Sequence, residues 1–253
     1  MIRRTMDAAF LTEVANDPQV RPFLGGDGPL DIGQVARDPA NVLLVATGRD
    51  GEPVGGWVLH PILPAVYELH TMFLPAGRGK LFFAAAAEMF RFMFAETDAL
   101  EIVTKCPDDN PGARMAASTV GFRERFRREG AWAPGVGVSY RVFSVDDWFI
   151  RDPECLAQGR AFHDALEAAK AGTGDPLLFN HTEDEAHDRA VGAAALMVRG
   201  GNTAKGVAFY NRWAALSGYA QVHAVSNAMI DVLEAIVWVR PDGFDVMLVR
   251  GVS

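Results

Sequence analysis

The spacing of apolar residues divides the first 150 residues into short alternating strands and helices. Apolar runs bounded by Gly, Pro or Asp predict strands, whereas apolar residues at i, i+3 and i+4 predict helices. In chain order, the pattern predicts a helix at Asp7–Val20, strands at Asn41–Thr47, Gly56–Ile62 and Tyr67–Leu74, a helix from Leu81 to about Ala95, and strands at Leu100–Cys106 and Val138–Val145. The helix between Tyr67–Leu74 and Leu100–Cys106 predicts that these two strands are parallel neighbours, because parallel strands need a crossover connection.

The rest of the chain predicts a second, smaller domain. Helices are expected at Glu154–Ala171, at Glu183–Arg199, and from Asn202 or Thr203 to about Ser217. The second of these follows a capping box of Thr182 and Glu185. Strands are expected at Val222–Val225, Ala228–Val239 and Phe244–Val249, and an Asp242-Gly243 turn joins the last two. The expected fold class is α/β (α+β). It consists of a mixed, mostly antiparallel sheet flanked by helices in residues 1–150, and an α+β domain of unassigned role in residues 151–253.

Composition narrows the class of protein. The chain has 253 residues, of which 49% are hydrophobic, and a net charge of −8. This hydrophobic content favours a packed core over disorder, and the negative charge argues against a dedicated nucleic-acid binder. The N-terminus lacks the apolar core of a secretion signal, and no apolar run is long enough to predict a membrane span. The two scattered cysteines, Cys106 and Cys155, are no disulfide framework and fit a reducing compartment.

Two clusters of polar residues invite a functional interpretation. Arg123, Arg125 and Arg127 alternate after Phe122, so an extended strand would project them on one face as a possible patch for phosphate groups. Glu124 and Glu129 balance them, which favours a solvated strand face. The other cluster comprises His181, Glu185, His187 and Asp188. Its two histidines do not have the i, i+4 spacing that places both on one helix face, so we expect no metal site.

A turn and a helix in the centre of the chain carry the chemistry. After strand Tyr67–Leu74, the segment Pro75 to Lys80 contains Arg78-Gly79-Lys80 and opens a helix. Further along, Asn110 precedes a short helix that ends at Gly121-Phe122. A helix N-terminus with a nearby glycine is suited to bind phosphate, because its first amides are unpaired and glycine lets the backbone approach the anion.

This order of elements resembles the acyl-CoA-binding half of the GNAT acetyltransferase superfamily. The resemblance covers roughly residues 1–150. It implies that Arg78, Gly79, Lys80 and Asn110 contact acetyl-CoA, and that Glu68 or His70 is a general base on the strand before the turn.

The chain departs from the family pattern at three positions. Leu81 and Phe83 stand where the family's phosphate loop has glycine or alanine, and Ala117 stands where a tyrosine often protonates the leaving thiolate. A register that begins at Leu74 restores Gly77 and Gly79 but loses the leading arginine. These departures predict weak binding of acetyl-CoA or none.

Three hypotheses of function follow from the resemblance. Because the pattern is similar to GNAT-like proteins of tailed bacteriophages, the first is a virion or assembly protein with no cofactor. It would associate with itself and with other virion proteins, and move from the host cytoplasm into the particle. The alternative is an acetyl-CoA-dependent N-acetyltransferase acting on an amine. The third is an intracellular regulator that binds a host protein.

Overall fold

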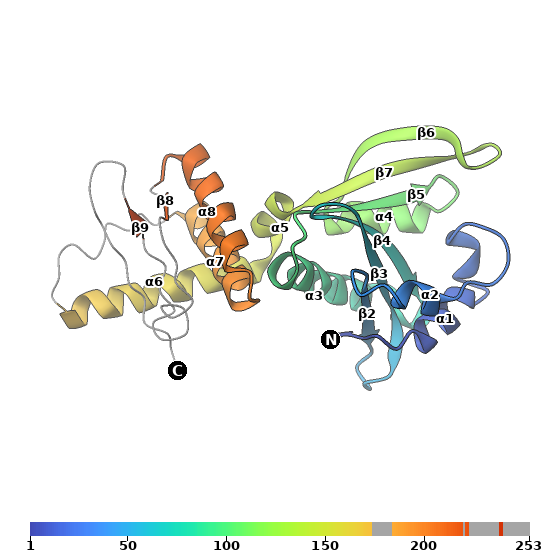
Figure 1. The fold of residues 1–253 in the computed structure, drawn as a ribbon, viewed down its shortest axis with the longest axis horizontal. Helices are drawn as coiled ribbons and strands as arrows, with labels where there is room; N and C mark the ends of the chain where they lie inside the picture. Colours follow the sequence, from blue (N-terminus) through green and yellow to red (C-terminus); the bar gives the residue numbers. More distant parts are fainter. Residues whose placement is uncertain (174–183, 220, 223–237, 240–253) are drawn as a thin grey trace. The chain divides into compact units, whose positions relative to one another are not determined.

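The computed structural model describes residues 1–173, 184–219, 221–222 and 238–239 (Figure 1). They form two compact units: Met1–Phe92 with Ala99–Asp147, and Met93–Asp98 with the described residues from Trp148 onward. Several predicted features lie outside the described residues. They are His181, the capping residue Thr182, the Asp242-Gly243 turn, the strand at 244–249, and most of the strands at 222–225 and 228–239. The domain division at residue 150 stays a prediction.

A seven-stranded sheet forms the centre of the first unit, in the order β1-β2-β3-β4-β5-β7-β6. The strands are β1 (Ile2–Arg4), β2 (Val42–Thr47), β3 (Pro53–Leu63), β4 (Val66–Phe73), β5 (Glu101–Pro107), β6 (Arg123–Ala133) and β7 (Val136–Ser144). Every neighbouring pair is antiparallel except β4 and β5, which are parallel and joined through α3 (Lys80–Glu96). The predicted fold class and the predicted parallel pair are confirmed.

Helices cover both faces of this sheet. Val58 of β3 and Met72 of β4 share a buried cluster with Leu11 and Val14 of α1 (Ala9–Asn16), and α2 (Ile32–Ala36) contributes to the same cluster. Trp57, the residue before Val58, points to the opposite face, because successive strand residues alternate. Its ring centroid lies 6.2 Å from that of Phe82 on α3. The first unit is therefore a sheet between two helical layers (Figure 1).

The short elements β1, α2 and α5 (Val145–Arg151) were not predicted, nor were the 3-10 helices η1 (Arg21–Phe23) and η2 (Pro75–Gly77). The sequence predicted a strand as far as Val145, but the chain begins a helix at this residue for a local reason. The amide of Asp147 donates to Ser144 Oγ (3.2 Å), and Ser144 Oγ donates to the Asp147 carboxylate (2.8 Å). This reciprocal bonding three residues apart is a capping arrangement that stabilises a helix N-terminus.

Closely packed helices make up most of the described second unit: α6 (Pro153–Thr173), α7 (Glu185–Arg199) and α8 (Thr203–Ser217), with a strand pair β8 (Gln221–Val222) and β9 (Trp238–Val239). A Cβ atom added at Gly159 of α6 would lie 1.9 Å from the Asp188 carbonyl oxygen of α7. One added at Gly192 of α7 would lie 1.8 Å from the Cys155 carbonyl oxygen of α6. The two helices therefore run antiparallel in contact, which only glycine allows at these positions.

The N-terminus of α7 differs from the prediction. Asp184, and not Thr182, caps the helix, and its side chain accepts a hydrogen bond from the Ala186 amide (2.9 Å).

None of the helices in the described part of the chain combines the length and apolar character needed to span a bilayer.

Candidate active site

A pocket opens where β4 and β5 stop pairing. Their backbone pairing covers only Val66–Glu101, Tyr67–Ile102 and Glu68–Val103. Beyond it, β4 continues along β3 as far as Phe73, and β5 continues along β7 as far as Pro107. A cavity of about 340 Å³ lies at this divergence, lined by both strands and by α3 and α4 (Pro111–Val120).

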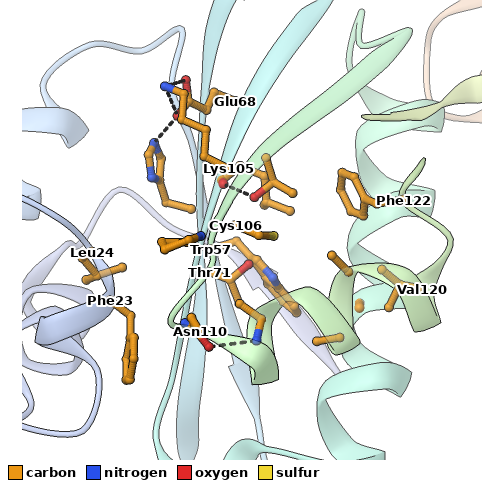
Figure 2. A pocket seen from close by; sticks show the side chains of 18 of the residues that line it. Phe23, Leu24, Trp57, Glu68, Thr71, Lys105, Cys106, Asn110, Val120 and Phe122 are labelled. Atoms are coloured by element: carbon orange, nitrogen blue, oxygen red, sulfur yellow. Dashed lines mark hydrogen bonds and ion pairs between the residues drawn. The ribbon is translucent and has the colours of Figure 1, made fainter. Parts of the chain in front are cut away.

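A carboxylate, an amine and an imidazole line one end of this pocket, and a second imidazole lies beside them. Lys105 Nζ lies 2.9 Å from both oxygens of Glu68, whose side chain is only 10% exposed. His70 Nε2 lies 3.8 Å from Glu68 Oε1, and His60 Nε2 lies 4.0 Å from Glu68 Oε2. Figure 2 shows Glu68 beside Lys105 at one end of the pocket and Asn110 at the other, with Thr71 and Cys106 between.

Strand register brings these four side chains together. Glu68 and His70 are two residues apart on β4, and His60 is the direct partner of Glu68 on β3. Lys105 is two residues beyond Val103, the partner of Glu68 on β5. All four therefore lie on one face of the sheet. The sequence singled out Glu68 and His70 but missed Lys105 and His60, whose only signal was a polar residue within an apolar strand.

The surroundings of His70 favour a neutral imidazole. Burial lowers the pKa of His70 below its ordinary value of 6.5, an effect that the nearby Glu68 carboxylate partly opposes and that His60 and Lys105 reinforce. Its ring stacks on that of His60 with centroids 5.1 Å apart and an angle of 11° between planes. A neutral imidazole at neutral pH is able to accept a proton.

The predicted phosphate loop lies at the other end. A second cavity, of about 500 Å³, is lined by Arg78 and Gly79 and shares Thr71 and Asn110 with the first, so the two adjoin. The Arg78 guanidinium donates to the carbonyl oxygens of Phe73 (3.2 Å) and Gln19 (3.1 Å). Lys80 is exposed and is not among the described residues that line either cavity.

These residues fit an acyl-CoA. Gly79 has φ +74°, and a Cβ added there would meet nothing within 4 Å, so the backbone before α3 is open to an approaching anion. The first amides of α3 have no partner within the helix, and the helix dipole favours negative charge there. Of the two bulky residues expected to obstruct this end, Phe83 lines the cavity and Leu81 does not. The predicted obstruction is thus only partly present.

Asn110 and Ala117 lie on the far wall of the pocket. Asn110 caps α4, with its side-chain oxygen accepting from the Ala113 amide (2.9 Å), and it borders both cavities. Ala117 lines the first cavity and offers no proton donor. Cys106 also lines it, but burial raises the pKa of its thiol to about 11, which keeps it neutral.

The predicted arginine patch does not form as one face. The pairing of β6 with β7 shifts between Glu124 and Phe126, so Arg125 is an extra residue in a bulge. The extra residue reverses the alternation of side chains along the strand, so Arg123 and Arg127 lie on opposite faces of the sheet. Each is also neutralised, Arg123 by Asp147 and Arg127 by Asp108.

Comparisons with known proteins identify the fold. No protein-family model and no curated protein matches the chain. Among solved structures, spermidine N-acetyltransferase from Vibrio cholerae in complex with CoA and spermine is similar, with 15% identity over 58% of this chain and 96% of that one, and a TM-score of 0.52. Mutant forms of the spermidine/spermine N-acetyltransferase SpeG from the same organism give 16% identity over 60% of this chain and 96% of that one, with a TM-score of 0.50.

These likenesses show a GNAT-like acetyltransferase fold. They also correct two expectations from the sequence. The hypothesis of a bacteriophage virion protein is wrong, because the similar structures named above are acetyltransferases. The expectation of no cofactor has no support, since one of these structures is a complex with CoA.

Proposed function

We propose that the chain is an acetyl-CoA-dependent N-acetyltransferase that acts on an amine. The observation that carries this proposal is the divergence of β4 and β5 after Glu68 and Val103. Two adjoining cavities lie there, one bordered by the bare backbone at Gly79 and the other by the cluster of Glu68, His70 and Lys105. A thioester bound along these cavities would have the anion-binding helix terminus at one end and a base at the other.

Each polar group then has a role. Acetyl-CoA supplies an activated acetyl group when it is bound. The neutral His70 imidazole takes a proton from the amine as its nitrogen bonds to the acetyl carbon, and the Glu68 carboxylate, 3.8 Å away, stabilises the imidazolium that forms. The C–S bond of the thioester breaks, and CoA leaves as a thiolate that takes its proton from solvent. Lys105 holds the Glu68 carboxylate in position through two contacts of 2.9 Å.

The test is an assay of CoA release with acetyl-CoA and a panel of primary amines, including spermidine and spermine because the similar structures bind or acetylate them. We expect at least one amine to be acetylated and H70Q to lower kcat/KM by about 10²-fold or more, the usual range for a lost general base. The matched control is R128Q, at an exposed position on β6 outside both cavities, which should retain activity.

Calorimetry with acetyl-CoA complements the assay. If acetyl-CoA binds but no tested amine is acetylated, the amines tested are the wrong substrates, and a wider panel of amines would be assayed. No binding at millimolar acetyl-CoA, together with no turnover of any amine, would contradict the proposed function.

A further inference from the structure

Three potential metal ligands converge in the second unit, outside the acyl-CoA site. His163 of α6 and His187 and Asp188 of α7 each offer one donor atom, and all three atoms lie within 4.8 Å of one another. His163 and Asp188 are buried, and His163 Nδ1 lies 2.5 Å from Asp188 Oδ1. The rings of His163 and His187 are stacked, with centroids 5.5 Å apart and planes at 10°.

The close approach of α6 and α7 creates this convergence. Gly159 lies one helical turn before His163, and the backbone of Asp188 occupies the space where a Gly159 side chain would be. Side chains four residues apart lie on the same helix face, so the contact at Gly159 directs His163 toward Asp188. The sequence could not show this, because the histidine that completes the set comes from a different helix.

We propose that His163, His187 and Asp188 bind one divalent transition-metal ion of the Zn²⁺ class. Two imidazoles and a carboxylate form a donor set that suits such ions, and three protein ligands leave one position for water. Ligand bonds of about 2.0–2.2 Å in a tetrahedral site place donor atoms roughly 3.3 Å apart. Small side-chain rotations bring atoms within 4.8 Å of one another to that spacing.

A neighbouring hydroxyl orients His187 for this role. His187 Nε2 lies 3.3 Å from the Tyr210 hydroxyl oxygen. A hydrogen bond at Nε2 leaves Nδ1, which is buried, as the ligand atom. Metal-binding histidines commonly have their other ring nitrogen held in this way.

The competing explanation is an ion pair between protonated His163 and Asp188, with no metal. The two states predict opposite responses to added metal, because ligation needs deprotonated imidazoles and an ion pair needs a protonated one. A metal ion would also supply the positive charge that two neutral imidazoles and one carboxylate lack.

The test uses the full chain, freed of metal with a chelator and titrated with Zn²⁺ by calorimetry and with Co²⁺ by visible absorption. We expect one equivalent of Zn²⁺ to bind with micromolar or lower Kd, and H163A, H187A and D188N each to weaken binding at least tenfold. H60Q removes a histidine of the first unit and should leave binding unchanged.

Zinc X-ray absorption of the unmodified chain provides a measurement that needs no variant, and it should show scattering from two imidazoles. A chain that binds Zn²⁺ no more tightly than H163A, or a bound ion without imidazole ligands, would overturn the proposal. If the variants do not fold, the absorption measurement decides alone. Acetyl-CoA binding is measured separately, so failure here leaves the proposed acetyltransferase activity untouched.

Discussion

At the scale of single residues, His70 is the group whose surroundings predict a measurable pH dependence. Its pKa lies below 6.5, chiefly because of burial, so the imidazole is neutral above that lowered value and loses its capacity as a base when pH falls through it. We expect the ratio of kcat/KM between the unmodified chain and H70Q to fall from roughly 10² at pH 8 toward one as the pH drops below this lowered pKa. The protonation of the amine substrate affects both kcat/KM values equally, so it cancels in their ratio.

The variant H60Q is the matched control for this profile. His60 lowers the pKa of His70, so its removal should move the acid limb toward higher pH while the plateau above it stays the same. A ratio that does not change with pH would mean that His70 is not the base. Glu68, held by Lys105, would then be the next candidate.

At the scale of elements, the cap of α4 links stability to the site. Asn110 Oδ1 accepts from the Ala113 amide, and loss of such a cap costs about 1 kcal/mol, within a range of roughly 0.5–2 kcal/mol. We therefore expect N110A to lower the free energy of unfolding by about this amount, measured by urea denaturation.

The substitution N110D serves as its control. Aspartate caps helices about as well as asparagine, so N110D should retain stability. The Asn110 side chain also borders both cavities, so a new negative charge there should weaken acetyl-CoA binding. Equal stability of N110A and the unmodified chain would show that the cap contributes nothing.

At the scale of the whole molecule, the two compact units predict ligand effects that are separable. Acetyl-CoA is assigned to the first unit and the metal ion to the second, and each unit has buried residues of its own. A ligand at 100 times its Kd stabilises the state that binds it by about 2.7 kcal/mol. In calorimetry we expect acetyl-CoA to shift the unfolding of the first unit and Zn²⁺ that of the second.

The variants H70Q and D188N provide the cross-check for this prediction. The first should retain the Zn²⁺ shift, and the second should retain the acetyl-CoA shift. If both ligands shift one shared unfolding transition, the chain unfolds as a single cooperative unit.

The expectation of self-association stays a prediction, and light scattering would measure the mass of the protein in solution.

The sequence alone determined the order of elements in the first unit. Apolar runs, the turn before α3, Asn110 at the start of α4 and Gly121 at its end are local signals, because each reflects the conformation of a few consecutive residues. Gly121, for example, adopts φ 111° as the helix ends, which glycine tolerates best. The same local logic identified Glu68 and His70 as neighbours on one strand face.

Only the tertiary structure decided which distant residues meet. Lys105 and His60 reach Glu68 through strand register, the bulge at Arg125 separates two arginines that the sequence alternates, and the Gly159 contact brings His163 to His187 and Asp188. It likewise turned Arg78 toward two backbone carbonyl oxygens, where the motif had predicted a phosphate ligand. Register and helix contact depend on packing between segments far apart in the chain, and a local pattern carries no information about which partner each segment finds.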